Sequence, residues 1–447
     1  MEYIYESVLD AVGRTPLIRL TRVTQGISTP VYLKAEFLNP GGSVKDRAAR
    51  HMVAAAERDG LLRPGGVIVE GTSGNTGIGL AIVAAQRGYR AVVVVPDKTS
   101  EDKIAVLRAY GAEVVVTPGG RPREHPEHVS QLARRIAEET PGGWFANQYD
   151  NPANPQAHVD TTGPEIWAQT AGRITHYVAG IGTGGTVSGT GAHLKRVSDG
   201  AVRVIGVDPE HSTYGGGDGS PYYVESIGHY RHPDTTEDLW PESYHPGVLD
   251  AVERVADRDA ITLTRDLARR EGLLVGASGG AAVAAALRVA RGLGPEDLVV
   301  VVAPDSGRNY LSKYFDDGWL RRNGFLDGDG TRPVLGDLLP AAAPLAVVPV
   351  TASVARAREV FAATGADVAL VVLERAPAAP TRAAGDVVGA LWRDALKGDT
   401  IEPLIAPSLP TAGVGEPVDA AWARIDEDWL AVLADGRVRA VLRRPAG

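Results

Sequence analysis

The sequence predicts an α/β fold built on parallel sheets, and two features of its first 325 residues carry that prediction. Short runs of β-branched residues alternate with longer helical patterns along this stretch, which favours a parallel arrangement of strands. The runs are apolar almost throughout, as is typical of strands buried on both faces of a parallel sheet. The expected strands are 31–36, 66–71, 91–96, 113–118, 176–182, 202–209 and 298–305, and the expected helices include 46–60, 77–88 and 103–110.

A second, smaller domain is expected at 334–447, after a turn-rich linker at 325–333. Residues 345–374 and 386–397 together favour the order strand, helix, strand, strand, helix. Residues 426–444 indicate two further strands joined by an Asp-Gly turn, which is a favourable hairpin connection. The chain is therefore expected to end in a separate α+β domain.

Composition excludes several classes of function. The 447-residue chain has a formal net charge of −9, whereas general nucleic-acid or membrane-surface binders are usually basic. It contains no cysteine, which excludes disulfides, thiolate metal sites and cysteine nucleophiles, and we predict no metal site. No apolar run reaches the roughly 18 residues of a membrane helix, and the N-terminus lacks a signal-peptide pattern. We expect a cytoplasmic protein that acts on small molecules, without nucleic-acid or membrane partners.

Lysine is scarce, and one lysine lies in an unusual position. Only seven of the 46 basic residues are lysine, and arginine cannot replace lysine where an amine must lose its proton and attack a carbonyl. Lys45 follows the turn Asn-Pro-Gly-Gly-Ser and opens a predicted helix. A helix N-terminus disfavours added positive charge, so the pKa of this amine is expected to be lowered. Lys45 is therefore a candidate nucleophile, although a lysine that extends from a helix start into solvent fits this stretch as well.

Two loops, each between a strand and a helix, add anion-binding chemistry. Residues 70–81 (EGTSGNTGIGLA) concentrate hydroxyl, amide and backbone N–H groups in one turn, which suits a carboxylate. Residues 179–191 (AGIGTGGTVSGTG) combine glycines with threonines, which suits a phosphate, and their register does not match a dinucleotide fingerprint. Each loop alone is also compatible with a tight structural turn. Together with a reactive lysine, they favour an amino acid bound to a phosphorylated aldehyde.

At these residues the sequence resembles the fold-type II pyridoxal-phosphate enzymes of the cystathionine β-synthase and cysteine synthase family. The matching stretches follow the family's order over about residues 1–322, and they are VGRTPLIRL, LNPGGSVKDR, EGTSGNTGIGLA, NQYDNPANPQAH, GIGTGGTVSGTG, LLVGASGGAAV and PDSGRNYLSKYFDDGWL. The resemblance implies a pyridoxal 5′-phosphate cofactor, a catalytic domain at 1–325 with two parallel-sheet subdomains, and a homodimer or higher homo-oligomer.

The family's motifs imply roles for individual residues. Lys45 matches the lysine that binds the cofactor aldehyde and later carries the proton of the substrate α-carbon. The other cofactor-binding residues implied are Asn75, Gly182, Thr183, Gly184, Gly185, Thr186 and Ser306, of which Ser306 matches the residue facing the pyridine nitrogen. The implied substrate-binding residues are Thr72, Ser73, Thr76, Gln148, Tyr149, Gly228 and His229.

The reaction that the resemblance implies is a β-replacement through an aminoacrylate. A serine hydroxyl at Ser306 would donate only a weak hydrogen bond to the cofactor ring, which favours prompt loss of a β-substituent over transamination. The sequence of residues 304–320 is similar to that of the cystathionine β-synthases. This resemblance implies that the substrates are L-serine, or an activated serine, and L-homocysteine, and that the product is L-cystathionine. The alternative is a cysteine synthase that uses O-acetylserine or O-phosphoserine with sulfide. A non-catalytic effector-binding protein is a hypothesis from a different class.

The sequence departs from the family pattern in two regions. Residues 224–233 carry His229 and Tyr230 where the family often has an acidic-aromatic pair. His229 is therefore either a proton carrier or a packing residue, and the nucleophile stays open among homocysteine, sulfide, cysteine and an amine. Residues 334–447 resemble a paired regulatory (Bateman, CBS-pair) module without its usual ribose-binding segment, which favours a degenerate structural or dimerising domain over an adenosyl-effector site. No haem is expected, because a thiolate ligand is excluded and the family core begins almost at residue 1.

Overall fold

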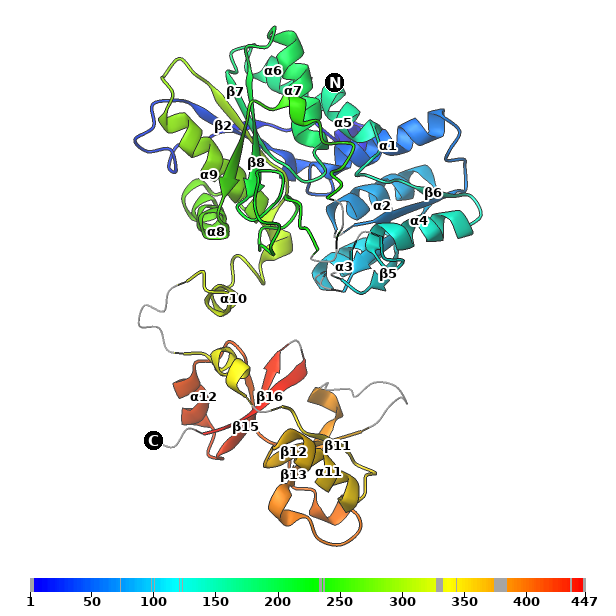
Figure 1. The fold of residues 1–447 in the computed structure, drawn as a ribbon, viewed down its shortest axis with the longest axis vertical. Coiled ribbons are helices and arrows are strands. Elements are labelled where there is room, and N and C mark those ends of the chain that lie inside the picture. The colour runs from blue at the N-terminus through cyan, green and yellow to red at the C-terminus, as the bar shows by residue number, and fades with distance from the viewer. Residues whose placement is uncertain are drawn as a thin grey trace. The chain divides into compact units, whose positions relative to one another are not determined.

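A computed structural model describes residues 4–72, 74–97, 99, 101–119, 121–122, 124–232, 235, 238–326, 333–342, 344–373, 384–434 and 436–444. The chain divides into two compact units, Met1–Phe315 and Asp316–Gly447 (Figure 1). Most of the expected linker, residues 327–332, lies outside the described residues. The domain limits expected from the sequence, 1–325 and 334–447, stay a prediction.

The first unit contains two sheets, and their strands are almost all parallel. The larger sheet has six strands in the order β1-β2-β10-β7-β8-β9, in which β1 runs antiparallel to β2. The smaller sheet has four parallel strands in the order β5-β4-β3-β6. The strands are β1 Leu17–Arg19, β2 Val31–Ala35, β3 Val67–Gly71, β4 Arg90–Pro96, β5 Glu113–Thr117, β6 Gly143–Phe145, β7 His176–Gly180, β8 Arg203–Pro209, β9 Ala251–Val255 and β10 Val299–Ala303. The prediction of an α/β fold with two parallel sheets is confirmed, and every predicted strand is present.

Helices fill the connections between these strands, with α2 to α4 beside the smaller sheet and α6 to α9 beside the larger one (Figure 1). The helices are α1 Lys45–Arg58, α2 Asn75–Arg87, α3 Glu101–Ala109, α4 Val129–Glu139, α5 Ala153–Ala157, α6 Gly163–Gln169, α7 Gly185–Val197, α8 Asp257–Asp266 and α9 Ala277–Arg291. Two π-helical turns, η3 His158–Thr162 and η5 Leu267–Glu271, extend α5 and α8, and 3₁₀ turns lie at η1 Val8–Ala11, η2 Glu36–Leu38, η4 Pro246–Val248 and η6 Gly307–Tyr310.

The central strands are buried because helices cover both faces of each sheet. All five residues of β3 and of β10 are buried, as their continuous apolar sequences predict. Within the first unit, the strands that the sequence did not predict are β1, β6 and β9, which are edge strands of three, three and five residues. A short, half-exposed edge strand needs no continuous apolar run, so its sequence resembles that of a loop.

The second unit repeats one small topology. Its two three-stranded sheets are β11-β12-β13 and β14-β15-β16. In each sheet the first two strands are parallel and are joined by a helix, and the third strand is antiparallel. The elements are α10 Asp317–Arg322, η7 Leu335–Ala341, β11 Val347–Pro349, α11 Val354–Thr364, β12 Val368–Val372, η8 Ala384–Asp386, β13 Val387–Trp392, η9 Arg393–Ala395, η10 Glu402–Leu404, β14 Thr411–Gly413, α12 Val418–Arg424, β15 Trp429–Ala434 and β16 Arg437–Arg443.

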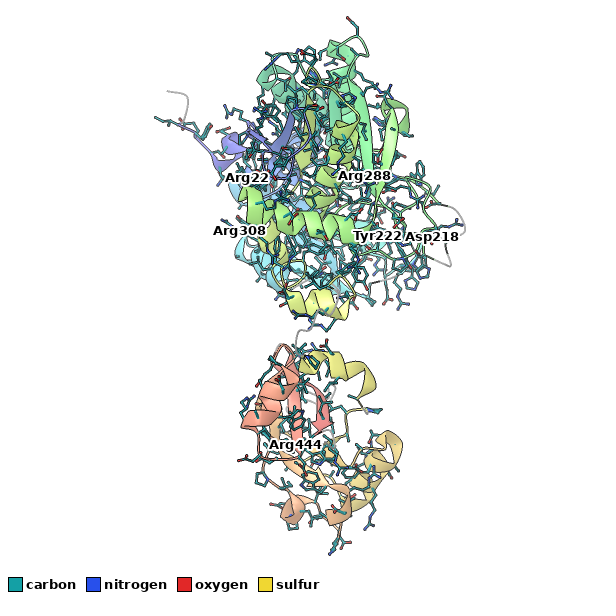
Figure 2. The ribbon with its side chains drawn as sticks, turned by 90° about the vertical axis from the view of Figure 1, so that its left-hand side faces the viewer. Arg22, Asp218, Tyr222, Arg288, Arg308 and Arg444 are labelled. Carbon is teal, nitrogen blue, oxygen red and sulfur yellow. The ribbon has the colours of Figure 1, made fainter. Side chains whose placement is uncertain are left out.

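The two sheets of the second unit share a core, in which Leu370 of one sheet and Ala431 of the other are both buried. The helix expected at the end of 386–397 is only the 3₁₀ turn η9, because β13 occupies most of that segment. Arg444, labelled in Figure 2, follows β16 and holds it to α12. Its guanidinium lies 5.2 Å from the centre of the Trp422 ring and donates to the Trp422 carbonyl at 3.1 Å.

Candidate active site

Loops at the carboxyl ends of β7 and β10 meet the start of α1 and form a pocket. This is where ligands bind in parallel α/β sheets. The pocket is lined by Val44, Lys45, Ala179, Gly180, Gly182, Thr183, Gly184, Thr186, Ser226, Ile227, Val302 and Pro304. The structure therefore brings the predicted lysine together with most of the predicted phosphate loop.

Lys45 is the first residue of α1, and the turn before it is fixed to the end of β10. The N–H of Val44 donates to the carbonyl of Pro304 at 2.8 Å. Burial lowers the pKa of Lys45, an effect that the charge of Asp305 partly opposes. A lowered pKa increases the fraction of free amine, which is the form that attacks a carbonyl.

The loop between β7 and α7 requires its glycines. Gly184 has φ +84°, a left-handed conformation that favours glycine, and a Cβ at this position would collide with Tyr244. A Cβ on Gly185 would collide with the side chain of Asn154. The loop can therefore bring the first N–H groups of α7 close to a ligand, where the helix dipole favours an anion.

The predicted carboxylate-binding residues lie on the loop between β3 and α2, on the first turn of α2 and on the segment after β6. Thr76 Oγ1 donates to Gln148 Oε1 at 2.5 Å, and both side chains are buried. Thr72 is also buried, and its Oγ1 accepts from the N–H of Gly74 at 3.3 Å. Tyr149 is 38% exposed, and Ser73 lies outside the described residues. The structure thus brings Thr76 and Gln148 into contact across 72 residues of sequence.

A buried acid that the sequence analysis did not single out, Asp305, contacts this loop. Its Oδ2 accepts from Asn75 Nδ2 at 2.7 Å and from the Tyr310 hydroxyl at 2.6 Å, and burial raises its pKa. Its neighbour Ser306 accepts the N–H of Arg308 at 3.3 Å, which leaves the Ser306 hydroxyl proton available to donate. The available signal is an acid at the end of the predicted strand 298–305, directly before Ser306.

Gly228 and His229 lie on the loop that follows β8. The N–H of Gly228 donates to the carbonyl of Ile181 at 2.6 Å, and its φ is +88°. His229 Nε2 lies 2.8 Å from Asp238 Oδ1, and its ring packs 5.4 Å from that of Tyr214. Ser226 and Ile227 of this loop line the pocket. The ring of His229 contacts Asp238 and Tyr214, and its backbone N–H donates to Ser212 Oγ at 2.8 Å. The packing interpretation of His229 therefore has structural support, and its role stays a prediction.

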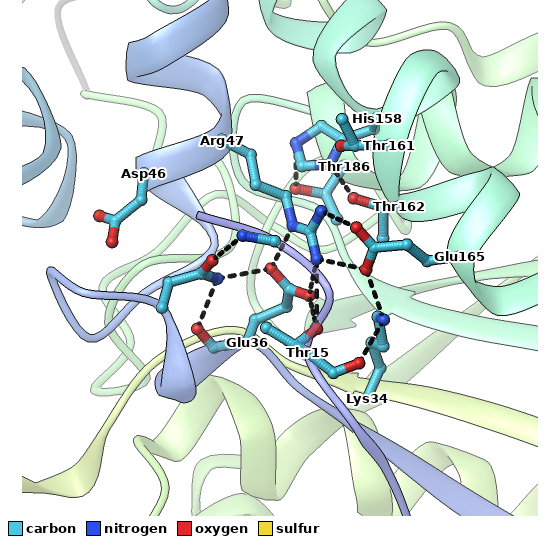
Figure 3. A network of polar contacts seen from close by, with 12 residues as sticks. Thr15, Lys34, Glu36, Asp46, Arg47, His158, Thr161, Thr162, Glu165 and Thr186 are labelled. Carbon is cyan, nitrogen blue, oxygen red and sulfur yellow. Dashed lines mark hydrogen bonds and ion pairs between the residues drawn. The ribbon is translucent and has the colours of Figure 1, made fainter. Parts of the chain in front are cut away.

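A buried charge cluster around Arg47 anchors α1 (Figure 3). Arg47 Nε donates to Glu36 at 2.7 Å, and its two terminal nitrogens reach Glu165 at 2.7 and 2.8 Å. Lys34 Nζ also lies 2.7 Å from Glu165. Although burial alone would raise the pKa of Glu165, the hydrogen bonds and charge of Arg47, together with Lys34, lower it to about 2. These contacts fix the helix that begins with Lys45.

A second charge cluster joins the parts of the chain that carry the two sheets. Glu225 contacts Lys103 of α3 at 2.9 Å and Lys313 at 2.5 Å. A lysine on a predicted helix is ordinarily solvated, but Lys103 is only 5% exposed and lies 4.5 Å from the centre of the Tyr310 ring. The partner is 122 residues away in sequence, so no local pattern indicates this contact.

Two other classes of site were sought among the residues that the structure describes. They hold no group of three or more histidine, aspartate or glutamate side chains arranged to bind a metal ion. In that same part of the chain, no helix has the length and apolar character needed to span a membrane.

Comparison with known proteins defines the class to which this fold and pocket belong. A profile described as pyridoxal-phosphate dependent enzyme matches residues 8–305, and the chain belongs to that family. Its cofactor is pyridoxal phosphate.

Within this family the chain resembles cystathionine β-synthases and cysteine synthases. It is 43% identical over 325 residues to the cystathionine β-synthase of Apis mellifera, covering 72% of this chain and 64% of that protein. It is 45% identical over 312 residues to a probable cysteine synthase of Bacillus subtilis, covering 69% of this chain and 97% of that protein. The crystal structure of O-ureido-L-serine synthase superposes with a TM-score of 0.64 at 40% identity, over 71% of this chain and 99% of the other. The chain thus spans less than two thirds of the Apis mellifera protein.

The residues of the pocket, together with Asp305 and Ser306, which follow the lining residue Pro304 in the chain, fit this cofactor. The glycine loop offers N–H groups for a phosphate, Lys45 offers an amine of lowered pKa, and Ser306 offers a hydroxyl proton. Asp305 Oδ1 is buried without a hydrogen-bond partner in the described residues, which is typical of a site that is completed by a ligand. The roles of these individual residues are part of the proposal below.

Proposed function

We propose that this protein catalyses a pyridoxal-phosphate-dependent β-replacement in which L-serine, or an activated serine, and L-homocysteine give L-cystathionine. The observation that carries the proposal is the position of Lys45, which lines a pocket together with a glycine-rich loop that can hold a phosphate. The similarity to cystathionine β-synthases supports the choice of substrates.

When bound, pyridoxal phosphate would supply an aldehyde for the substrate amine and an electron-accepting ring for the α-carbon. Thr72, Thr76 and Gln148 bind the substrate carboxylate and so orient the α-carbon. Lys45 takes the α-proton, since burial lowers the pKa of its amine, and returns this proton after the nucleophile has added at the β-carbon. Ser306 donates a weak hydrogen bond to the ring, which favours loss of the β-substituent.

A cysteine synthase activity is the second candidate, with O-acetylserine or O-phosphoserine as the donor and sulfide as the nucleophile. The similarity to the Bacillus subtilis protein favours it, because the alignment covers 97% of that chain. Product analysis with each donor paired with homocysteine, and then with sulfide, separates the two candidates. Cystathionine from serine and homocysteine as the most rapidly formed product supports the first candidate, and cysteine from an activated serine and sulfide supports the second.

The enzyme proposal is tested by Lys45→Ala, with Lys397→Ala as the matched control. Lys397 is exposed in the second unit. We expect the Lys45 variant to lose at least about a thousandfold in kcat, because its nucleophile and its proton carrier are removed together, and we expect the control to keep full activity. Full activity in the Lys45 variant would refute the proposal and favour a binding protein.

We further propose that residues 334–447 form a degenerate paired regulatory (CBS-pair-like) module and that the protein is a homodimer or higher homo-oligomer in the cytoplasm. The repeated strand-helix-strand-strand topology of the second unit supports the module. Titration with S-adenosylmethionine while the unfolding temperature is followed tests for an adenosyl effector. A rise that saturates would overturn the degenerate assignment, and sedimentation equilibrium measures the oligomer.

A further inference from the structure

Two buried polar residues contact the glycine-rich loop without any role in the proposed chemistry. Asn154 and His158 belong to the segment NPANPQAH, and each is only 1% exposed. Asn154 Nδ2 donates to Thr183 Oγ1 at 3.0 Å. His158 Nε2 lies 3.2 Å from Thr186 Oγ1, and its Nδ1 lies 2.8 Å from Thr162 Oγ1 (Figure 3). The segment thus contacts both threonines of the loop that line the pocket.

The direction of the Thr183 hydroxyl proton follows from its contacts. A hydroxyl group has one proton to donate and two lone pairs that accept. Thr183 Oγ1 accepts from Asn154 Nδ2 at 3.0 Å and from the N–H of Gly185 at 3.3 Å. With both lone pairs engaged, its proton is left to be donated to a ligand in the pocket that Thr183 lines.

The direction of the Thr186 hydroxyl proton depends on His158. Burial first, and then the charges of Arg47 and Lys45, hold the pKa of His158 well below its usual range. The ring is therefore neutral and carries a single N–H, on either Nδ1 or Nε2. If the proton is on Nε2, Thr186 accepts it and can donate its own proton to an anion. If the proton is on Nδ1, Thr186 donates to the ring and turns only lone pairs towards the anion.

We propose that His158 is a positioning residue whose Nε2–H tautomer, held by the Thr162 hydroxyl at Nδ1, makes Thr186 donate to the phosphate group of the cofactor. Thr183 and Thr186 then present two hydroxyl donors to one anion. The inference rests on the proposed assignment of residues 182–186 as the phosphate-binding loop. His158, which lies outside that loop, then determines how strongly the loop binds phosphate.

Two amide substitutions separate the tautomers. The side-chain amide of His158→Gln reaches the position of Nε2 and keeps a donor towards Thr186. The shorter amide of His158→Asn reaches only the position of Nδ1, so it can contact Thr162 but not Thr186. The dissociation constants of each apoprotein are measured by equilibrium dialysis for pyridoxal phosphate and for pyridoxal, and by ³¹P NMR titration for inorganic phosphate. Thr161→Val is the matched control, because Thr161 lies in the same turn and donates to the carbonyl of Ala157.

We expect His158→Asn to bind pyridoxal phosphate and inorganic phosphate between about tenfold and a hundredfold more weakly, the range for a hydrogen bond to a charged group. Pyridoxal binding should be unchanged, and His158→Gln and Thr161→Val should remain within about threefold of the unsubstituted protein. Thr186→Val should show the same loss, and its combination with His158→Asn should add little, because both remove one interaction.

Equal phosphate affinity in His158→Asn and the unsubstituted protein would overturn the inference. An equal loss for pyridoxal and pyridoxal phosphate would overturn it too, because His158 would then only fill space between helices. If the unsubstituted protein itself binds pyridoxal as tightly as pyridoxal phosphate, the phosphate-loop assignment fails, and with it the basis of the proposed function. If His158→Asn does not fold, the Thr186→Val and His158→Gln variants decide the question.

Discussion

Glu165→Gln should destabilise the protein strongly and in a pH-dependent way. Glu165 accepts two hydrogen bonds from Arg47, one from Lys34 and one from the N–H of Arg14, all at 2.7–2.9 Å, and its side chain is only 17% exposed. Its pKa is lowered from 4.5 to about 2, which corresponds to about 3 kcal/mol of stability at neutral pH. Loss of one partner of a buried ion pair costs a similar amount, about 3–5 kcal/mol. Because the amide keeps the shape of the side chain, the measured loss of unfolding free energy reports the removal of its negative charge.

The pH dependence provides a second, independent check. Because the folded pKa of Glu165 lies below the unfolded value, its contribution is complete above the unfolded pKa of 4.5 and is lost as the pH falls towards about 2. The difference in unfolding free energy between the two proteins should therefore fall from about 3 kcal/mol at pH 7 to about 1.5 kcal/mol at pH 3.

The assay is urea denaturation of both proteins at each pH, with the cofactor at the same saturation, since bound ligand adds stability. Glu113→Gln is the control, because Glu113 pairs with Arg90 at 3.5 Å and its side chain is 61% exposed. Such a surface pair contributes at most about 1 kcal/mol. A Glu165→Gln loss below about 1 kcal/mol at pH 7, or an equal loss at pH 7 and pH 3, would refute the reasoning.

Three further predictions concern a glycine of the phosphate loop, Glu70 of β3 and Glu225 after β8. Gly184→Ala should cost about 1–3 kcal/mol more stability than Gly88→Ala in urea denaturation. Both positions have positive φ, but of the two only Gly184 has atoms that a Cβ would meet. Equal losses in the two variants would contradict the collision with Tyr244. Glu70 is buried and its pKa is raised to about 8. Stability should therefore fall as the pH rises from 4.5 to 8, and Glu70→Gln should remove that fall and add about 1–3 kcal/mol at pH 8; a parallel pH profile in the variant would contradict this. Glu225→Gln should cost about 2–3 kcal/mol, since it removes the carboxylate that pairs with the buried ammonium of Lys103 at 2.9 Å. An unchanged melting temperature would show that this ion pair does not stabilise the fold.

Local sequence patterns predicted the fold and most of the pocket for physical reasons. Strands such as β3 and β10 are buried on both faces, so their residues are apolar without interruption. Gly184 is fixed by backbone conformation and close approach, which only glycine satisfies. Lys45 was recognisable because a lysine at a helix start after a glycine turn is chemically unusual.

Long-range contacts account for what the sequence analysis missed. Lys103 is on a helix, where lysine is ordinarily solvated, but the fold places it against Glu225. Asp305 becomes part of the site through Asn75, which is 230 residues away. His158 belongs to a motif that was recognised, but only the packing of η3 against the start of α7 shows that its ring meets Thr186. Such pairings depend on which elements become neighbours, and no local periodicity encodes that.

The strand order of the larger sheet has a consequence for how the protein is made. β10 lies between β2 and β7, but it is the last strand of the first unit to leave the ribosome. Until residues 299–303 emerge, no strand connects the pair β1 and β2 to β7, β8 and β9. The smaller sheet needs only residues 67–145 and can assemble early. The edge of β2 therefore stays unpaired from residue 35 until β10 is made, and the edge of β7 stays unpaired over a shorter interval, from residue 180. These two unfinished, apolar edges are the regions where the nascent chain depends most on chaperones.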